Sequence, residues 1–127
     1  MALFRCASGS SGGSGYSSGE GVTSHAGEEV TIHTGLSSIS EFYLVYNLVG
    51  YDDSNLMATL YRSDRTYKQT AVWVYASSYN FLKWNSFATS DGNCVVITGI
   101  NGGDVSIKTG NGSATWGSVE YYWTAKA

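Results

Sequence analysis

Residues 95–125 read VVITGINGGDVSIKTGNGSATWGSVEYYWTA, and this stretch decides the fold class of the chain. Apolar and polar residues alternate in it over three runs, and side chains of a strand repeat every two residues, so each run has one apolar face. Asn101-Gly102 and Asn111-Gly112 separate the runs. Asn-Gly between alternating runs is the strongest short-range hairpin signal, because both residues tolerate the positive φ of tight turns. The stretch therefore predicts a three-stranded antiparallel meander whose apolar face needs a second layer to cover it.

The chain before this stretch supplies further short strands. Alternating or β-prone runs occupy residues 29–34, 40–49, 56–62, 70–77 and 79–87, and no helical periodicity persists over three turns. Turn signals recur about every 8–12 residues, as in sandwiches and jelly rolls. Residues 40–49 carry apolar groups on both faces, which predicts a central strand or one whose outer face meets another subunit. We expect an all-β, antiparallel two-sheet sandwich of about eight strands.

The N-terminal segment has a different composition. Residues 7–21 are almost wholly Ser and Gly, which predicts an extended arm over residues 1–22 that precedes a sandwich domain over residues 23–127. Leu3, Phe4 and Tyr16 are its candidate anchors. Twenty extended residues reach on the order of 65 Å. Two interpretations stay open: the arm lies across a neighbouring subunit, or it folds back on its own domain.

Composition excludes several classes of function. Charged residues make up 13% of the 127 residues, and the formal net charge is −3. No basic cluster is present that could neutralise phosphates, so nucleic-acid binding is not expected. Neither a secretory signal nor an apolar run of membrane-spanning length is visible. These features predict synthesis in a cytosol without a signal peptide, no membrane insertion, and release by lysis or by assembly into a particle.

The ionisable and nucleophilic residues do not form a recognisable catalytic or metal motif. The carboxylates of Glu28-Glu29 and Asp52-Asp53 are adjacent in sequence, and neighbouring side chains of an extended chain point apart. The two histidines and two cysteines lack the close spacings of a zinc site. A nucleophile elbow and a phosphate loop are also missing. We expect a protein that is not an enzyme and that uses no metal or cofactor.

Aromatic residues are the most informative side chains, with four Trp and ten Tyr. Trp73 and Trp123 alternate with apolar partners, which predicts core positions. An exposed aromatic residue can contact another subunit, stack on a sugar or simply face solvent. The candidates for an assembly interface are Leu3, Phe4, Tyr16, Tyr43 and Val45. The candidates for sugar stacking are Trp84, Trp116, Tyr51 and Tyr79.

Four segments carry a resemblance to a known family: MALFRC at residues 1–6, GLSSI at 35–39, INGGDV at 100–105 and YYWTA at 121–125. Together they resemble the short β-sandwich virion proteins of tailed bacteriophages that infect Gram-positive hosts. The last segment is also similar to the final strand of H-type lectin domains, which are trimeric sandwiches that bind sugars near their subunit interfaces.

The resemblance implies a structural protein of the virion, displayed on the particle surface. The position could be a tail-fibre or baseplate tip, or a capsid decoration or head fibre. The expected partners are further copies in a homo-oligomer, with a trimer favoured, other virion proteins, and glycans of the host surface. The alternative hypothesis is a carbohydrate-binding module or lectin that uses exposed Trp and Tyr residues.

Overall fold

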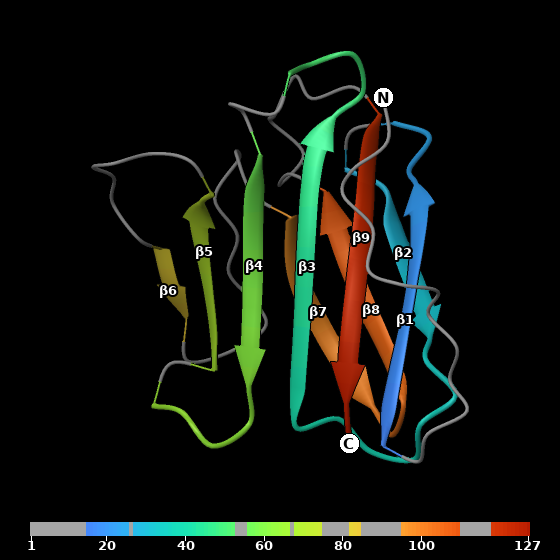
Figure 1. The fold of residues 1–127 in the computed structure, drawn as a ribbon, viewed down its shortest axis with the longest axis vertical. Coiled ribbons are helices and arrows are strands. Elements are labelled where there is room, and N and C mark those ends of the chain that lie inside the picture. Colours follow the sequence, from blue (N-terminus) through green and yellow to red (C-terminus); the bar gives the residue numbers. More distant parts are fainter. Residues whose placement is uncertain are drawn as a thin grey trace.

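The computed structural model describes residues 15–25, 27–52, 56–66, 68–74, 82–84, 95–109 and 118–127. For residues 73 and 82–84 it describes the backbone only. These residues form nine strands in two antiparallel sheets and no helix, which confirms the all-β, two-sheet fold (Figure 1). Within these segments, no helix exists that could cross a membrane. The expected turn Asn111-Gly112 lies outside the described residues.

The larger sheet has six strands in the order β1-β9-β3-β4-β5-β6. Their bounds are β1 (Tyr16–Val22), β9 (Val119–Lys126), β3 (Glu41–Leu48), β4 (Met57–Arg62), β5 (Gln69–Trp73) and β6 (Leu82–Trp84). The smaller sheet has the order β2-β8-β7, with bounds β2 (Glu29–His33), β8 (Asp104–Thr109) and β7 (Val95–Asn101). Figure 1 shows the smaller sheet behind β3, β9 and β1 of the larger one.

The core lies between the sheets and follows the predicted alternation. Along β3, Phe42, Leu44 and Tyr46 are buried and face the smaller sheet, whereas Tyr43 is exposed on the other face. The same alternation buries one face of β4, β8 and β9. The main core contains Ile32, Phe42, Leu44, Tyr46, Met57, Tyr61, Val95, Ile97, Val105, Ile107, Val119, Tyr121 and Trp123. Trp123 is therefore a core residue, as expected; the side chain of Trp73 lies outside the described part.

The predicted meander over residues 95–125 is wrong in its last strand. β7 and β8 form the expected hairpin in the smaller sheet, but β9 lies between β1 and β3 in the larger sheet. An alternating pattern defines which face of a strand is buried, but it does not say which strand is its neighbour. The apolar faces of β8 and β9 still belong to one core, because the two strands lie in opposite sheets and these faces point toward each other.

The β7–β8 turn is also displaced by one residue from the expected Asn-Gly position. Asn101 pairs with Asp104, so Gly102 and Gly103 are the two loop residues. Gly102 has φ +61° and Gly103 is not in the positive-φ region, which matches the type II′ turn with glycine at its first central position. A Cβ on Gly103 would lie 1.7 Å from the backbone oxygen of Leu36, so the close approach of the 34–37 segment also requires glycine there.

Residues 16–22, expected within the arm, form β1 and pair with β9 along seven residues. The boundary expected at residue 22 thus falls after a strand of the sandwich. Glycine is needed in this strand because large side chains of β9 lie across it. A Cβ on Gly19 would be 2.7 Å from the Trp123 ring, and one on Gly21 would be 2.4 Å from the Tyr121 hydroxyl oxygen. The Ser/Gly composition therefore reflects close packing in this segment rather than a flexible linker.

Side-chain hydrogen bonds join the two sheets where β4 and β5 approach β7. Gln69 is 1% exposed, and its amide binds both backbone groups of Ile97, at 3.0 Å from Nε2 to the carbonyl oxygen and 3.0 Å from the amide nitrogen to Oε1. Thr59 Oγ1 donates to the carbonyl oxygen of Val95. The ladder between β7 and β8 is irregular between Ile97 and Gly99. The side-chain amide of Gln69 thus takes the place of a neighbouring strand: it satisfies the N–H and C=O groups of Ile97 on the free edge of β7, beside this irregularity.

Candidate functional site

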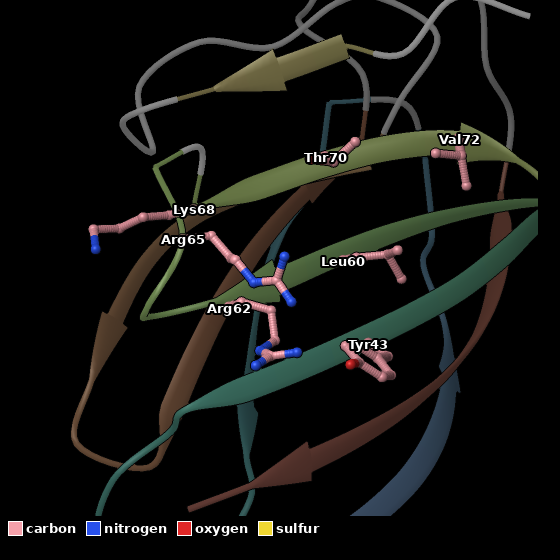
Figure 2. A pocket seen from close by; sticks show the side chains of 7 residues that line it. All are labelled: Tyr43, Leu60, Arg62, Arg65, Lys68, Thr70 and Val72. Atoms are coloured by element: carbon pink, nitrogen blue, oxygen red, sulfur yellow. The ribbon is translucent and has the colours of Figure 1, made fainter.

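A hollow of about 300 Å³ lies on the outer face of the larger sheet, away from the core. Strand register explains how it forms. Tyr43, Leu60 and Thr70 pair in one row across β3, β4 and β5, and the next position along β5 on this face is Val72. Beyond the row, Arg62 pairs with Glu41, and its backbone N–H donates to the carbonyl oxygen of Lys68 at 2.9 Å. Figure 2 shows the residues that line the hollow: Tyr43, Leu60, Arg62, Arg65, Lys68, Thr70 and Val72.

The floor of the hollow is apolar and accessible. The exposed fraction is 37% for Tyr43 and 36% for Leu60, and Val72 is half-buried. The same sheet face holds a small separate cluster of Leu56 and Tyr122, against which Val45 packs. Apolar groups therefore occur on both faces of β3, as the sequence predicted for residues 40–49.

The rim of the hollow is cationic. The guanidinium groups of Arg62 and Arg65 lie side by side at the end of β4, and the Lys68 ammonium extends away from them (Figure 2). Asp64 contacts both arginines, at 3.2 Å from Arg62 Nη2 and 3.7 Å from Arg65 Nε, and Glu41 lies 3.5 Å from Arg62 Nε. Lys68 Nζ donates to the carbonyl oxygen of Ser63 at 2.8 Å. Among the described residues, three cations thus lie near two carboxylates here.

Arg62 keeps its charge in this setting. Partial desolvation by itself lowers the pKa of Arg62, but the carboxylates of Asp64 and Glu41 and a hydrogen bond with Tyr43 outweigh it and raise this pKa above its ordinary value. The side chain of Arg65 is 62% exposed and that of Arg62 is 32% exposed. Each guanidinium has five N–H donors, more than these two carboxylates use.

The structure brings three of the expected assembly residues onto one face. Tyr16, Tyr43 and Val45 all lie on the outer face of the larger sheet, with Tyr16 at 42% exposure on the edge strand β1. Leu3 and Phe4 lie outside the described residues.

Of the expected sugar-stacking residues, only Tyr51 has a described side chain. Tyr51 is 52% exposed in the turn after β3. Trp84 is the last residue of β6, whose side chains are not described, and Tyr79 and Trp116 lie outside the described residues. The candidates remain a prediction.

A further pair of ionisable side chains lies away from the hollow. His33 Nδ1 lies 2.9 Å from Asp104 Oδ1 at the exposed end of the β2–β8 pair. Among the described residues, no group of three His, Cys, Asp or Glu side chains could hold a metal ion. Asp52 is in the turn after β3, where Asn47 Nδ2 donates to its carbonyl oxygen at 2.8 Å.

The comparisons with known proteins return no relative. No family model matches the sequence, and neither curated proteins nor solved structures include a match.

Reasoning from the sequence missed the hollow. Residues 63–68 look like a charged loop, and nothing in the sequence order shows that Tyr43 of another strand lies beside this loop. One signal was available: on either side of the loop, Leu60, Arg62, Thr70 and Val72 alternate with buried residues and so share the outer face of the sheet.

Proposed function

We propose that this chain is a structural subunit displayed on the surface of a bacteriophage particle, where it forms a homo-oligomer with a trimer favoured. The observation that supports assembly is the edge strand β1. β1 ends its sheet in the described part of the chain, so one row of its backbone groups has no strand partner there. Tyr16 and Val22, at its two ends, have exposed fractions of 42% and 64%. An edge strand with exposed apolar groups favours contact with another chain.

The composition agrees with a repeated, packed subunit. Few charges are available to a chain with 13% charged residues, so hydroxyl, amide and tyrosine groups dominate its polar surface. Tyrosine buries a large area for little loss of side-chain entropy, which suits interfaces. The placement in a virion is supported by the sequence resemblance, and either a tail-fibre or baseplate tip or a capsid decoration or head fibre fits it.

The oligomer mass in solution tests the assembly. We expect light scattering after size-exclusion chromatography to give a homo-oligomer for the full chain and a lower mass for the double variant Tyr16→Ser with Val22→Thr. Both positions are exposed, so these changes should leave the fold intact. Val49→Thr, also exposed at 49% but outside β1, is the matched control and should keep the oligomer. A monomeric full chain at high protein concentration would contradict the assembly.

Labelling of particles tests the virion location. Antibodies raised against the chain should decorate phage particles from the strain that carries its gene, as seen by immunogold electron microscopy. Purified particles that lack the chain, both by labelling and by mass spectrometry, would overturn the virion assignment even if the chain is oligomeric.

A second candidate function, sugar binding, is favoured by the hollow rather than by the residues first expected. Its floor combines an exposed tyrosine with two aliphatic side chains, and Thr70 offers a hydroxyl group. On a virion surface, such a site would serve attachment to the host.

A further inference from the structure

We propose that the hollow on the outer face of β3, β4 and β5 binds an anionic saccharide, a sugar ring that bears a carboxylate or a phosphate. The described residues that line the hollow are not among the stacking candidates named from the sequence. Its role in attachment rests on the proposed function, whereas the binding itself does not.

The first argument is charge. Arg62 and Arg65 place two guanidinium groups next to each other, and Asp64 contacts both. Among the described residues, the contact of 3.7 Å to Asp64 is the only ion pair of Arg65. Guanidinium groups bind carboxylates and phosphates through paired N–H donors. An anion at this rim would therefore meet unused donors and would balance the third cation of the hollow.

The second argument is the floor. An inorganic anion would use the arginines but would leave Tyr43, Leu60 and Val72 in contact with water. A ring with C–H groups on one face covers these side chains, and the aromatic ring of Tyr43 offers the flat surface on which such a face stacks. Thr70 lies in the same row as Tyr43 and Leu60 and supplies a hydroxyl group for a sugar oxygen.

The third argument is size and geometry. A volume of about 300 Å³ is at the small end of ligand pockets and suits one sugar unit rather than a long polymer segment. The three cations among the described lining residues lie at one end of the hollow, beyond the row of Tyr43 and Leu60 (Figure 2). This polarity orients the ligand, with its acidic group at the arginines and its ring over the tyrosine.

The test is a titration of the full, isotope-labelled chain followed by amide NMR shifts. The probes are glucuronate, glucose 6-phosphate, glucose and inorganic phosphate. We expect saturable shifts in β3, β4 and β5 with at least one of the two acidic sugars. Glucose and inorganic phosphate should bind about tenfold more weakly, since glucose lacks the acidic group and inorganic phosphate lacks the sugar ring. The two acidic sugars distinguish a carboxylate ligand from a phosphate ligand.

Variants assign the binding to the hollow. Arg65→Gln removes an exposed rim cation and should weaken binding of the acidic sugar about tenfold. Tyr43→Leu keeps the floor apolar but removes the aromatic ring, and it should weaken the acidic sugar while leaving inorganic phosphate unchanged. Lys108→Gln removes the same charge from β8 in the other sheet and should have no effect on binding. Dispersed amide spectra of each variant confirm folding.

Several results would overturn the proposal. These are no saturable binding of either acidic sugar, an affinity for the acidic sugar that binds no higher than the affinity for glucose or for inorganic phosphate, or shifts confined to other strands. The outcome is separate from that of assembly: a monomer that binds an acidic sugar contradicts the oligomer alone, and an oligomer that binds none contradicts the ligand site alone.

Discussion

Gly19 shows how one residue in a Ser/Gly segment can have a structural role. The Trp123 side chain lies over it from the neighbouring strand and stacks on Phe42, with ring centroids 5.8 Å apart, on its other side. The tryptophan is 7% exposed and is held between these two residues. A methyl group at residue 19 therefore meets a ring that has little room to move.

Gly19→Ala should destabilise the protein. An ordinary Gly→Ala change in a compatible conformation stabilises by about 0.4–1 kcal/mol through the unfolded chain. Here the added Cβ would be 2.7 Å from the Trp123 ring, and we expect a loss of about 1–3 kcal/mol from overpacking. Urea denaturation followed by tryptophan fluorescence measures it. Ser18→Ala in the same strand is the control, since Ser18 Oγ is buried with no hydrogen-bond partner among the described residues and its removal should cost nothing. A stabilised Gly19→Ala variant would contradict the packing.

Gln69 is the second residue whose importance appears only in the folded chain. Gln69→Leu keeps the volume roughly constant but leaves the N–H and C=O groups of Ile97 without the bonds that Gln69 makes. Each unsatisfied buried group costs about 1–3 kcal/mol, so we expect a loss of about 3 kcal/mol in the free energy of unfolding. Thr70→Val, at the neighbouring outward position, should change stability by less than about 0.5 kcal/mol. Equal stability of the two variants would show that water replaces the Gln69 amide.

At the scale of the element, deletions that keep or remove β1 should affect stability differently. Deletion of residues 1–14 leaves β1 in place, so the sandwich should unfold at nearly the same urea concentration. Deletion of residues 1–22 removes the strand that covers Trp123 and Tyr121 and exposes the edge of β9, so we expect a loss of several kcal/mol or failure to fold. Circular dichroism with urea denaturation checks both. Equal stability of the two truncated chains would mean that β1 contributes nothing to the fold.

The strands illustrate how far local patterns reach. Residues 29–34, 40–49 and 56–62 were predicted as strands, and β2, β3 and β4 lie within them. The buried faces of β2 and β3 also follow the predicted alternation, because a pattern with a period of two residues reports directly which side chains leave water. The position of β9 was predicted wrongly, since a hairpin signal acts over a few residues while sheet order depends on partners far away in the chain. The strand β1 was not predicted, because its Ser/Gly sequence has no apolar alternation. Glycine is required there by contact with Trp123, which lies about a hundred residues later in the chain.

At the scale of the whole molecule, stability should fall at high pH because folding buries tyrosine side chains, Tyr61 and Tyr121 among them. Burial raises the pKa of Tyr61 above its ordinary value of 10.0. Burial, and then the nearby carboxylate of Glu28, raises the pKa of Tyr121 above the same value. Above pH 10 the unfolded chain therefore loses protons that the folded chain keeps. The contribution to stability is fully present below pH 10, and it decreases as the pH rises from 10 to the raised pKa values of the two tyrosines.

The slope of this decrease is at most about 1.4 kcal/mol per pH unit for each tyrosine. Urea denaturation between about pH 9 and 11 measures it, a range that brackets the ordinary tyrosine pKa. The variant with both Tyr61→Phe and Tyr121→Phe should show a shallower decrease, whereas Tyr51→Phe, at an exposed residue, should behave as the original chain. An identical slope in all three proteins would assign the alkaline instability to other groups.

The amino-acid sequence by itself determined the fold class, the faces of the strands and the core role of Trp123, because burial in a strand leaves a pattern with a period of two residues. Tertiary structure alone decided the order of the strands, the bond between Gln69 and β7, the need for glycine in β1 and the hollow beside Arg62 and Arg65. Each of these depends on residues that are distant in sequence and adjacent only through strand register. That information is held in the packing of one element on another, and no local pattern records it.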